Sequence, residues 1–165
     1  MKKVMNLKSL LFCAMLVLTM SLNTVNAQAG ALDYLGHTID GSELTNEMES
    51  IGNYQSVARS TYLHQGFVRI TNNGGGYVGI GAGTECNVTC GTVKLNVYLE
   101  RSSGSEDFYS YKKWENVDYN TSSLYLNQQV KVEKGYYYRL RGYHSCTKNG
   151  VLENGASRTD DIYIG

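Results

Sequence analysis

The amino-acid sequence predicts an all-β protein, built as an antiparallel β-sandwich of seven strands. The chain of 165 residues contains 18 glycines, 14 tyrosines and no proline. Tyrosine, valine and threonine favour the pleated, half-buried surface of a sheet, so the turns must be made by glycine, asparagine, aspartate and serine. From Thr61 onward, apolar and polar residues alternate with a period of two, which is typical of half-buried strands.

The first 27 residues predict a cleaved secretory signal helix. Lysines without any acid occupy residues 1–9, an apolar run follows over residues 10–22, and Val25 and Ala27 stand where a signal peptidase reads. The apolar run is shorter than the roughly 20 residues of a membrane span. We therefore expect cleavage after Ala27, or else after Ala29, and a secreted, extracellular product with no membrane anchor.

Residues 28–59 are predicted to form a flexible acidic arm that precedes the β-sandwich domain of residues 60–165. No sustained period runs through this arm, and Asp40–Ser50 is polar and acidic, a composition that buries too little apolar surface to order itself. Once the three lysines of the signal are removed, 12 basic side chains face 15 acidic ones. Phosphate neutralisation dominates nucleic-acid affinity, so we expect no nucleic-acid partner for this mildly acidic chain.

Seven strands separated by short turns are expected in the domain. Asn73 and Gly74 lie between two apolar runs and predict a hairpin, because primed turns need positive φ. A polar loop is expected over residues 147–158. The strands are expected over residues 61–71, 77–83, 92–100, 108–117, 124–132, 136–145 and 161–165. Their inward-facing positions predict a core that includes Val93, Leu95, Val97, Leu99, Tyr138, Leu140, Ile162 and Ile164.

One stretch resembles the corner between strands E and F of the fibronectin-type-III fold, a member of the immunoglobulin-like sandwiches. Gly135 is followed three residues later by Tyr138, which begins an alternating strand. The resemblance implies that the hydroxyl of Tyr138 bonds back to upstream backbone. Lys134 stands where that fold usually has a proline, and a jelly roll or another Greek-key sandwich remains an alternative.

The chain also resembles a family of short secreted proteins of unknown function from clostridia-like Gram-positive bacteria. The stretches that carry this resemblance are the acidic Asp40–Ser50, Val97–Arg101, Lys134–His144 and Thr159–Ile164. The resemblance implies a bacterial source and export, and it implies no activity.

Residues 76–84 invite a dinucleotide-binding interpretation that we reject. Gly79 and Gly81 fit the first two glycines of that motif, but Thr84 stands at the third and no βαβ unit follows. Close backbone packing or a bulge in a strand accounts for these glycines better. No nucleophile elbow, zinc-protease motif or carboxylate cluster appears either, so we expect no catalytic residues and no enzyme.

Three cysteines remain after the signal, and export favours pairing two of them. In a sandwich, the loop that carries Cys86 and Cys90 lies at the same end as the loop that Cys146 opens. The sequence predicts a disulfide from Cys146 to one of the other two. A zinc site of the three cysteines with His144 is one alternative, and free thiols are another; we expect no cofactor and no bound metal.

The strand over residues 136–145 predicts a binding surface, because period-two geometry places its tyrosines and arginines on the solvent side. Tyrosine and arginine are enriched at contact hot spots, although cross-strand packing alone also favours them. The candidate binding residues are Lys94, Tyr98, Tyr137, Arg139, Arg141, Tyr143 and Tyr163.

These features favour a secreted, non-catalytic β-sandwich that binds an extracellular glycan or protein at a surface. A small secreted toxin or bacteriocin-like effector is the alternative, and a secreted hydrolase or metal-dependent enzyme is a third possibility. A small domain that is exported on its own needs an external target, which places the binding function first.

Overall fold

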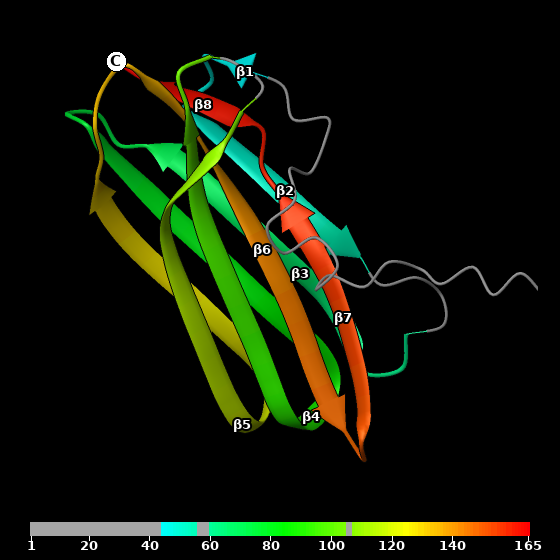
Figure 1. Ribbon diagram of the computed structural model, residues 1–165. Coiled ribbons are helices and arrows are strands. Elements are labelled where there is room, and N and C mark those ends of the chain that lie inside the picture. Colours follow the sequence, from blue (N-terminus) through cyan, green and yellow to red (C-terminus); the bar gives the residue numbers. More distant parts are fainter. Residues whose placement is uncertain (1–43, 56–59, 105–106) are drawn as a thin grey trace, which may run out of the picture.

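A computed structural model describes residues 44–55, 60–104 and 107–165 (Figure 1). The predicted signal helix and residues 28–43 of the predicted arm lie outside these described ranges. All regular elements of the described residues are strands. They are β1 (Leu44–Thr45), β2 (Glu49–Gln55), β3 (Leu63–Asn72), β4 (Tyr77–Ser102), β5 (Tyr109–Lys131), β6 (Tyr136–Lys148), β7 (Val151–Arg158) and β8 (Asp161–Ile164).

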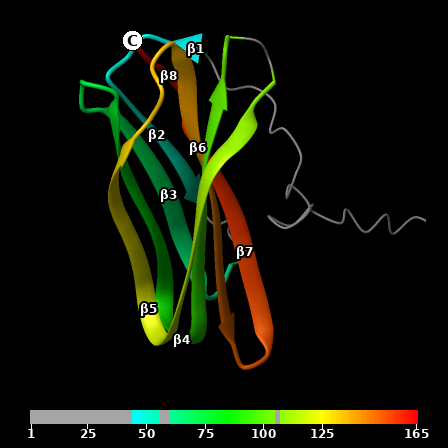
Figure 2. The same cartoon turned by 60° about the vertical axis from the view of Figure 1, so that its left-hand side comes forward.

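Two very long strands, β4 and β5, pair along most of their length and organise the sheet. The first half of β4 also pairs with β3, and its second half pairs with β6. The ladder between β4 and β5 shifts register between Glu85 and Cys90, and β5 contains a residue with positive φ, Asn120. A bulge bends a strand and increases its twist. Both strands therefore curl over at this point, and the two halves of the ribbon face each other (Figure 2).

The result is one curled, mixed sheet of eight strands. β2 and β3 lie in the layer behind, and β6 and β7 lie in the layer in front (Figures 1 and 2). The all-β prediction is confirmed, but a seven-stranded antiparallel sandwich is not what forms. Two expected turns, at residues 84–91 and 118–123, are bends within continuous strands, and β1 pairs with β8 in parallel.

Two segments expected to lack regular structure are strands. β2 pairs with β3 along residues 49–55, so this end of the predicted flexible arm belongs to the sheet. Residues 151–158 of the predicted polar loop form β7, which pairs with β6. The signal for β7 was present in Asn149 and Gly150, both of which have positive φ in the turn; an Asn-Gly pair is a hairpin signal even when the strand after it is polar.

The predicted core is confirmed. Each of the eight expected core residues, which are Val93, Leu95, Val97, Leu99, Tyr138, Leu140, Ile162 and Ile164, is at most 1% exposed. The hydroxyl of Tyr138 donates to the carbonyl oxygen of Glu133 at 2.8 Å, as the corner motif implies. The hairpin at Asn73 and Gly74 is also confirmed, because it joins β3 to β4. No helix in the described part of the chain is long and apolar enough to cross a membrane.

Candidate functional site

The predicted binding face on β6 is mostly buried. Its alternation is as expected, because Tyr138 and Leu140 lie in the core and their neighbours point to the other side of the strand. However, Arg139 is 2% exposed, Arg141 is 5% exposed and Tyr143 is 4% exposed. The prediction that these three side chains lie on the solvent side is therefore wrong.

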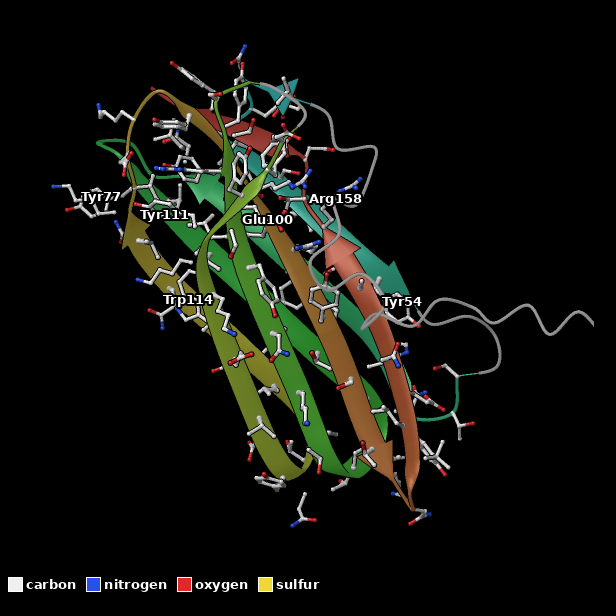
Figure 3. The ribbon with its side chains drawn as sticks, in the orientation of Figure 1. Tyr54, Tyr77, Glu100, Tyr111, Trp114 and Arg158 are labelled. Carbon is white, nitrogen blue, oxygen red and sulfur yellow. The ribbon has the colours of Figure 1, made fainter. Side chains whose placement is uncertain are left out.

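The carboxylate of Glu100 accompanies the two arginines below the surface. Glu100 lies on β4 (Figure 3) and is 3% exposed. It accepts a hydrogen bond from Nε of Arg139 at 2.9 Å and pairs with Nη2 of Arg141 at 2.5 Å. The guanidinium of Arg139 also lies 3.8 Å from the ring centroid of Phe108. The attraction of one carboxylate for two guanidinium groups opposes the desolvation cost of burying these charges, so this cluster belongs to the interior of the fold and not to a contact surface.

The other residues of the predicted face pack against their cross-strand neighbours. Tyr98 meets Tyr143 edge to face with ring centroids 5.5 Å apart, and Tyr137 meets Tyr163 at 5.1 Å. Such pairs stabilise a sheet without any ligand. Lys94 is exposed and lines a shallow depression of about 280 Å³. The accessible part of the predicted face is thus reduced to Lys94 and the partly exposed tyrosines.

A groove lies on the outer face of the other layer. Gly79, Gly81 and Gly83 alternate along β4 and point away from the core, since the residues between them are buried. The register places Arg69 of β3, Gly81 and Asn127 of β5 in one row. The glycines thus leave a floor of bare backbone between two walls of side chains. The groove has a volume of about 540 Å³ and is lined by Arg69, Thr71, Asn73, Gly79, Ile80, Gly81, Asn127, Gln128 and Gln129.

Two aromatic rings lie over Gly83, the next glycine on this face of β4 beyond those that line the groove. A Cβ atom on Gly83 would lie 2.4 Å from Cε1 of Phe67 and 2.8 Å from Cδ1 of Tyr125, so both rings lie directly over the backbone there. Tyr125 remains 53% exposed, and its hydroxyl donates to Oε1 of Glu85 at 2.8 Å. An exposed tyrosine whose hydroxyl is hydrogen-bonded to Glu85 therefore lies next to the groove.

The walls of the groove carry hydrogen-bonding groups of both kinds. On β3, Arg69 donates through Nε to Glu49 at 2.7 Å, and the hydroxyl of Thr71 donates to the same carboxylate at 3.2 Å. On β5, Asn127 and Gln129 are exposed, and each amide offers both a donor and an acceptor. The groove is therefore polar, and the carboxylate of Glu49, which contacts its β3 wall, is already paired with a guanidinium.

The three cysteines converge at the bend of β4. Cys86 lies within the register shift of that strand, Cys90 ends it, and Cys146 of β6 pairs opposite Val93. Their three Sγ atoms lie within 4.8 Å of one another. All three are free thiols in the structure, so the disulfide stays a prediction. The pKa of Cys86 is lowered, because its hydrogen bond with Cys146 outweighs the opposing effect of burial. The pKa of Cys146 is raised by the same hydrogen bond and by burial.

His144 does not join the cysteines, which corrects the four-ligand alternative. Its ring is fully buried between two hydroxyl groups, with Nδ1 2.9 Å from Oγ1 of Thr84 and Nε2 2.7 Å from Oγ of Ser157. Burial lowers the pKa of His144 to about 4. The ring is therefore neutral at pH 7 and fully engaged within the core.

The groove was missed in the sequence although its signal is visible there. Three glycines at alternate positions of a strand leave one whole face without side chains, because successive residues point to opposite faces. We interpreted Gly79 and Gly81 as packing or a bulge. Only the placement of β3 and β5 on either side turns that bare face into a groove.

Comparison with known proteins places the chain among proteins without an assigned activity. A family model described as a family of unknown function (DUF6147) matches residues 34–161. A search of the curated proteins found no match.

Proposed function

We propose that this chain, which belongs to the family of unknown function DUF6147, is a secreted, non-catalytic β-domain that binds an extracellular glycan in its glycine-floored groove. The observation that carries the proposal is the row of Gly79 and Gly81 between two polar walls, with Tyr125 lying over Gly83, the next glycine on the same face of β4. The signal-like residues 1–27 support export.

The chemistry of the groove matches that of a sugar chain. A sugar ring presents hydroxyl groups at its edge, which donate and accept hydrogen bonds, and it presents an apolar face. The amides of Asn127 and Gln129 and the hydroxyl of Thr71 complement the edge. The exposed ring of Tyr125 complements the apolar face. A flat floor without side chains lets an extended glycan approach the backbone closely.

The same groups support a binding role without catalysis. Amides, a hydroxyl and a guanidinium are poor general acids and bases near pH 7. Glu49 beside the groove is engaged by Arg69 and Thr71, and Glu85 accepts hydrogen bonds from Gln65 and Tyr125. We therefore place the activity of this face in recognition rather than in hydrolysis.

The proposal is tested by a glycan array probed with the full chain, followed by calorimetry on the glycans that bind. Gly81→Val should block the floor of the groove with a side chain. The fold should tolerate the change, because an added Cβ meets only Oδ1 of Asn127 at 3.6 Å and Cβ of Arg69 at 3.7 Å. Tyr125→Ala should remove the stacking ring. We expect each change to weaken binding at least about tenfold, the effect of a hot-spot residue.

Matched controls separate the groove from the face predicted first. Tyr119→Ala removes another exposed tyrosine, at 64% against 53% for Tyr125, from the other half of β5 and should leave binding unchanged. Lys94→Ala tests the accessible part of the predicted β6 face. Glycan binding that resists Gly81→Val, or that is lost with Lys94→Ala, would contradict the proposal, as would a protein ligand with no glycan bound.

A further inference from the structure

The bend of β4 brings three thiols to one point inside the curled sheet. Cys86 lies within the register shift of the β4–β5 ladder, and Cys90 is the first residue paired with β5 after it. Cys146 meets them from β6, and all three Sγ atoms lie within 4.8 Å of one another. Three residues from two strands thus converge although they are up to 60 positions apart in the chain.

The surroundings of the three sulfur atoms combine an apolar wall with one open side. Cys90 and Cys146 are each 1% exposed and pack with Leu63 and Val93 in a small apolar cluster. Cys86 is half-buried at its margin. This arrangement keeps two thiols away from solvent and leaves a path to the third.

The spacing of the sulfur atoms suits a shared central ion. Sulfur lies about 2.3 Å from a zinc-like ion, so three thiolates around one centre are about 4 Å apart. The observed upper limit of 4.8 Å needs only a small inward movement. A disulfide requires about 2.05 Å between two sulfur atoms and uses only two of these three cysteines.

We infer that Cys86, Cys90 and Cys146 form a three-thiolate site for one thiophilic d¹⁰ metal ion of the Cu(I) or Zn²⁺ class. Thiolate ligands select such ions over Mg²⁺ or Ca²⁺, which prefer oxygen. Within the described residues, no histidine, aspartate or glutamate completes this group, and both ring nitrogens of His144 already contact hydroxyl groups. Cu(I) would be held by the three sulfur atoms alone, whereas Zn²⁺ would take a water molecule as its fourth ligand from the side of Cys86.

The test uses the full chain in a Cys13→Ser background, so that the remaining thiols are those of the cluster. The fully reduced protein is titrated anaerobically with Cu(I) in one arm and Zn²⁺ in the other, each against a competing chelator. We expect one ion per chain, ultraviolet charge-transfer absorption from thiolate to metal in the Cu(I) arm, and protection of all three thiols from alkylation. The arm with the higher affinity identifies the ion.

Single substitutions assign the ligands. Each of the substitutions Cys86→Ser, Cys90→Ser and Cys146→Ser removes a thiolate ligand. Each should weaken ion binding at least about tenfold, since even the loss of an outer-shell partner of a ligand costs roughly 10–100-fold. Met48→Leu, which replaces an exposed sulfur elsewhere, should not weaken it. Alkylation protection in the unsubstituted cluster keeps the test valid if a serine variant fails to fold. The inference is overturned if the reduced protein binds no ion at one equivalent. It is also overturned if the protein isolated without reductant holds a peptide pair linked through Cys146 and no metal.

Discussion

The imidazole of His144 occupies the space that a side chain of Gly66 would need. A Cβ atom on Gly66 would lie 2.2 Å from Cγ and 2.4 Å from Cδ2 of the ring, so β3 and β6 approach each other closely at this point. The two hydroxyl groups that bond the ring nitrogens hold it there. The same closeness recurs between β2 and β7, where Tyr54 (Figure 3) covers Gly155.

Gly66→Ala should destabilise the protein. The ring cannot move aside without losing its hydrogen bonds to Thr84 and Ser157, so the added methyl group overpacks the space between the layers, at a cost of about 1–3 kcal/mol. Urea denaturation measures this loss. Gly81→Ala is the matched control, because its Cβ meets nothing closer than 3.6 Å and should change the free energy of unfolding by less than about 0.5 kcal/mol. Equal effects at the two positions would contradict the close approach.

The stability of the protein should fall between pH 6.5 and pH 4 because of His144. Burial lowers the folded-state pKa of His144 to about 4, whereas the unfolded value is about 6.5. The unfolded state therefore binds more protons in this interval. The stabilisation of the folded state by neutral His144 is complete above pH 6.5. It is lost as the pH falls toward 4, and this loss lowers the free energy of unfolding by about 3 kcal/mol at most. Urea denaturation at stepped pH should show a shallower decline for His144→Gln; identical slopes would refute the assignment to this histidine.

Glu100→Gln should be strongly destabilising. The substitution leaves Arg139 and Arg141 buried without the carboxylate between them, and breaking a buried ion pair costs roughly 3–5 kcal/mol. Glu115→Gln is the control, because Glu115 forms an exposed pair with Lys113, and such pairs contribute about 0–1 kcal/mol. Thermal or urea unfolding compares the two. A small effect at Glu100 would mean that the arginines can reach solvent, as the sequence had suggested.

Export should remove the N-terminal segment. N-terminal sequencing of protein recovered from the medium of a Gram-positive host should begin at Gln28, or at Gly30 if the second site is used. Recovery of the protein only with membranes, or a product that keeps Met1–Ala27, would contradict this expectation. The control is a chain in which Ala27 is replaced by a bulky residue, which should shift or block cleavage.

The sequence by itself determined which residues enter the core, because alternation of apolar and polar side chains is a local property of a strand. This alternation is the reason why Leu95 and Leu140 were predicted correctly as core residues. Local chemistry also determined the hairpin at Asn73 and Gly74 and the bond from Tyr138 to the backbone, since positive φ and a short return contact depend on few neighbouring residues. A polar strand such as β7, by contrast, gives too little alternation to be recognised.

Only the tertiary structure decided what each strand lies beside. Two expected turns became bends, because the pairing of β4 with β5 resumes beyond them after a register shift. The solvent side predicted for β6 became the burial site of Arg139 and Arg141, since alternation tells which residues share a face and not whether that face is covered. The groove over Gly81 and the meeting of Cys86, Cys90 and Cys146 likewise depend on contacts between strands distant in sequence. Such contacts arise from packing the whole sheet, and no local pattern encodes them.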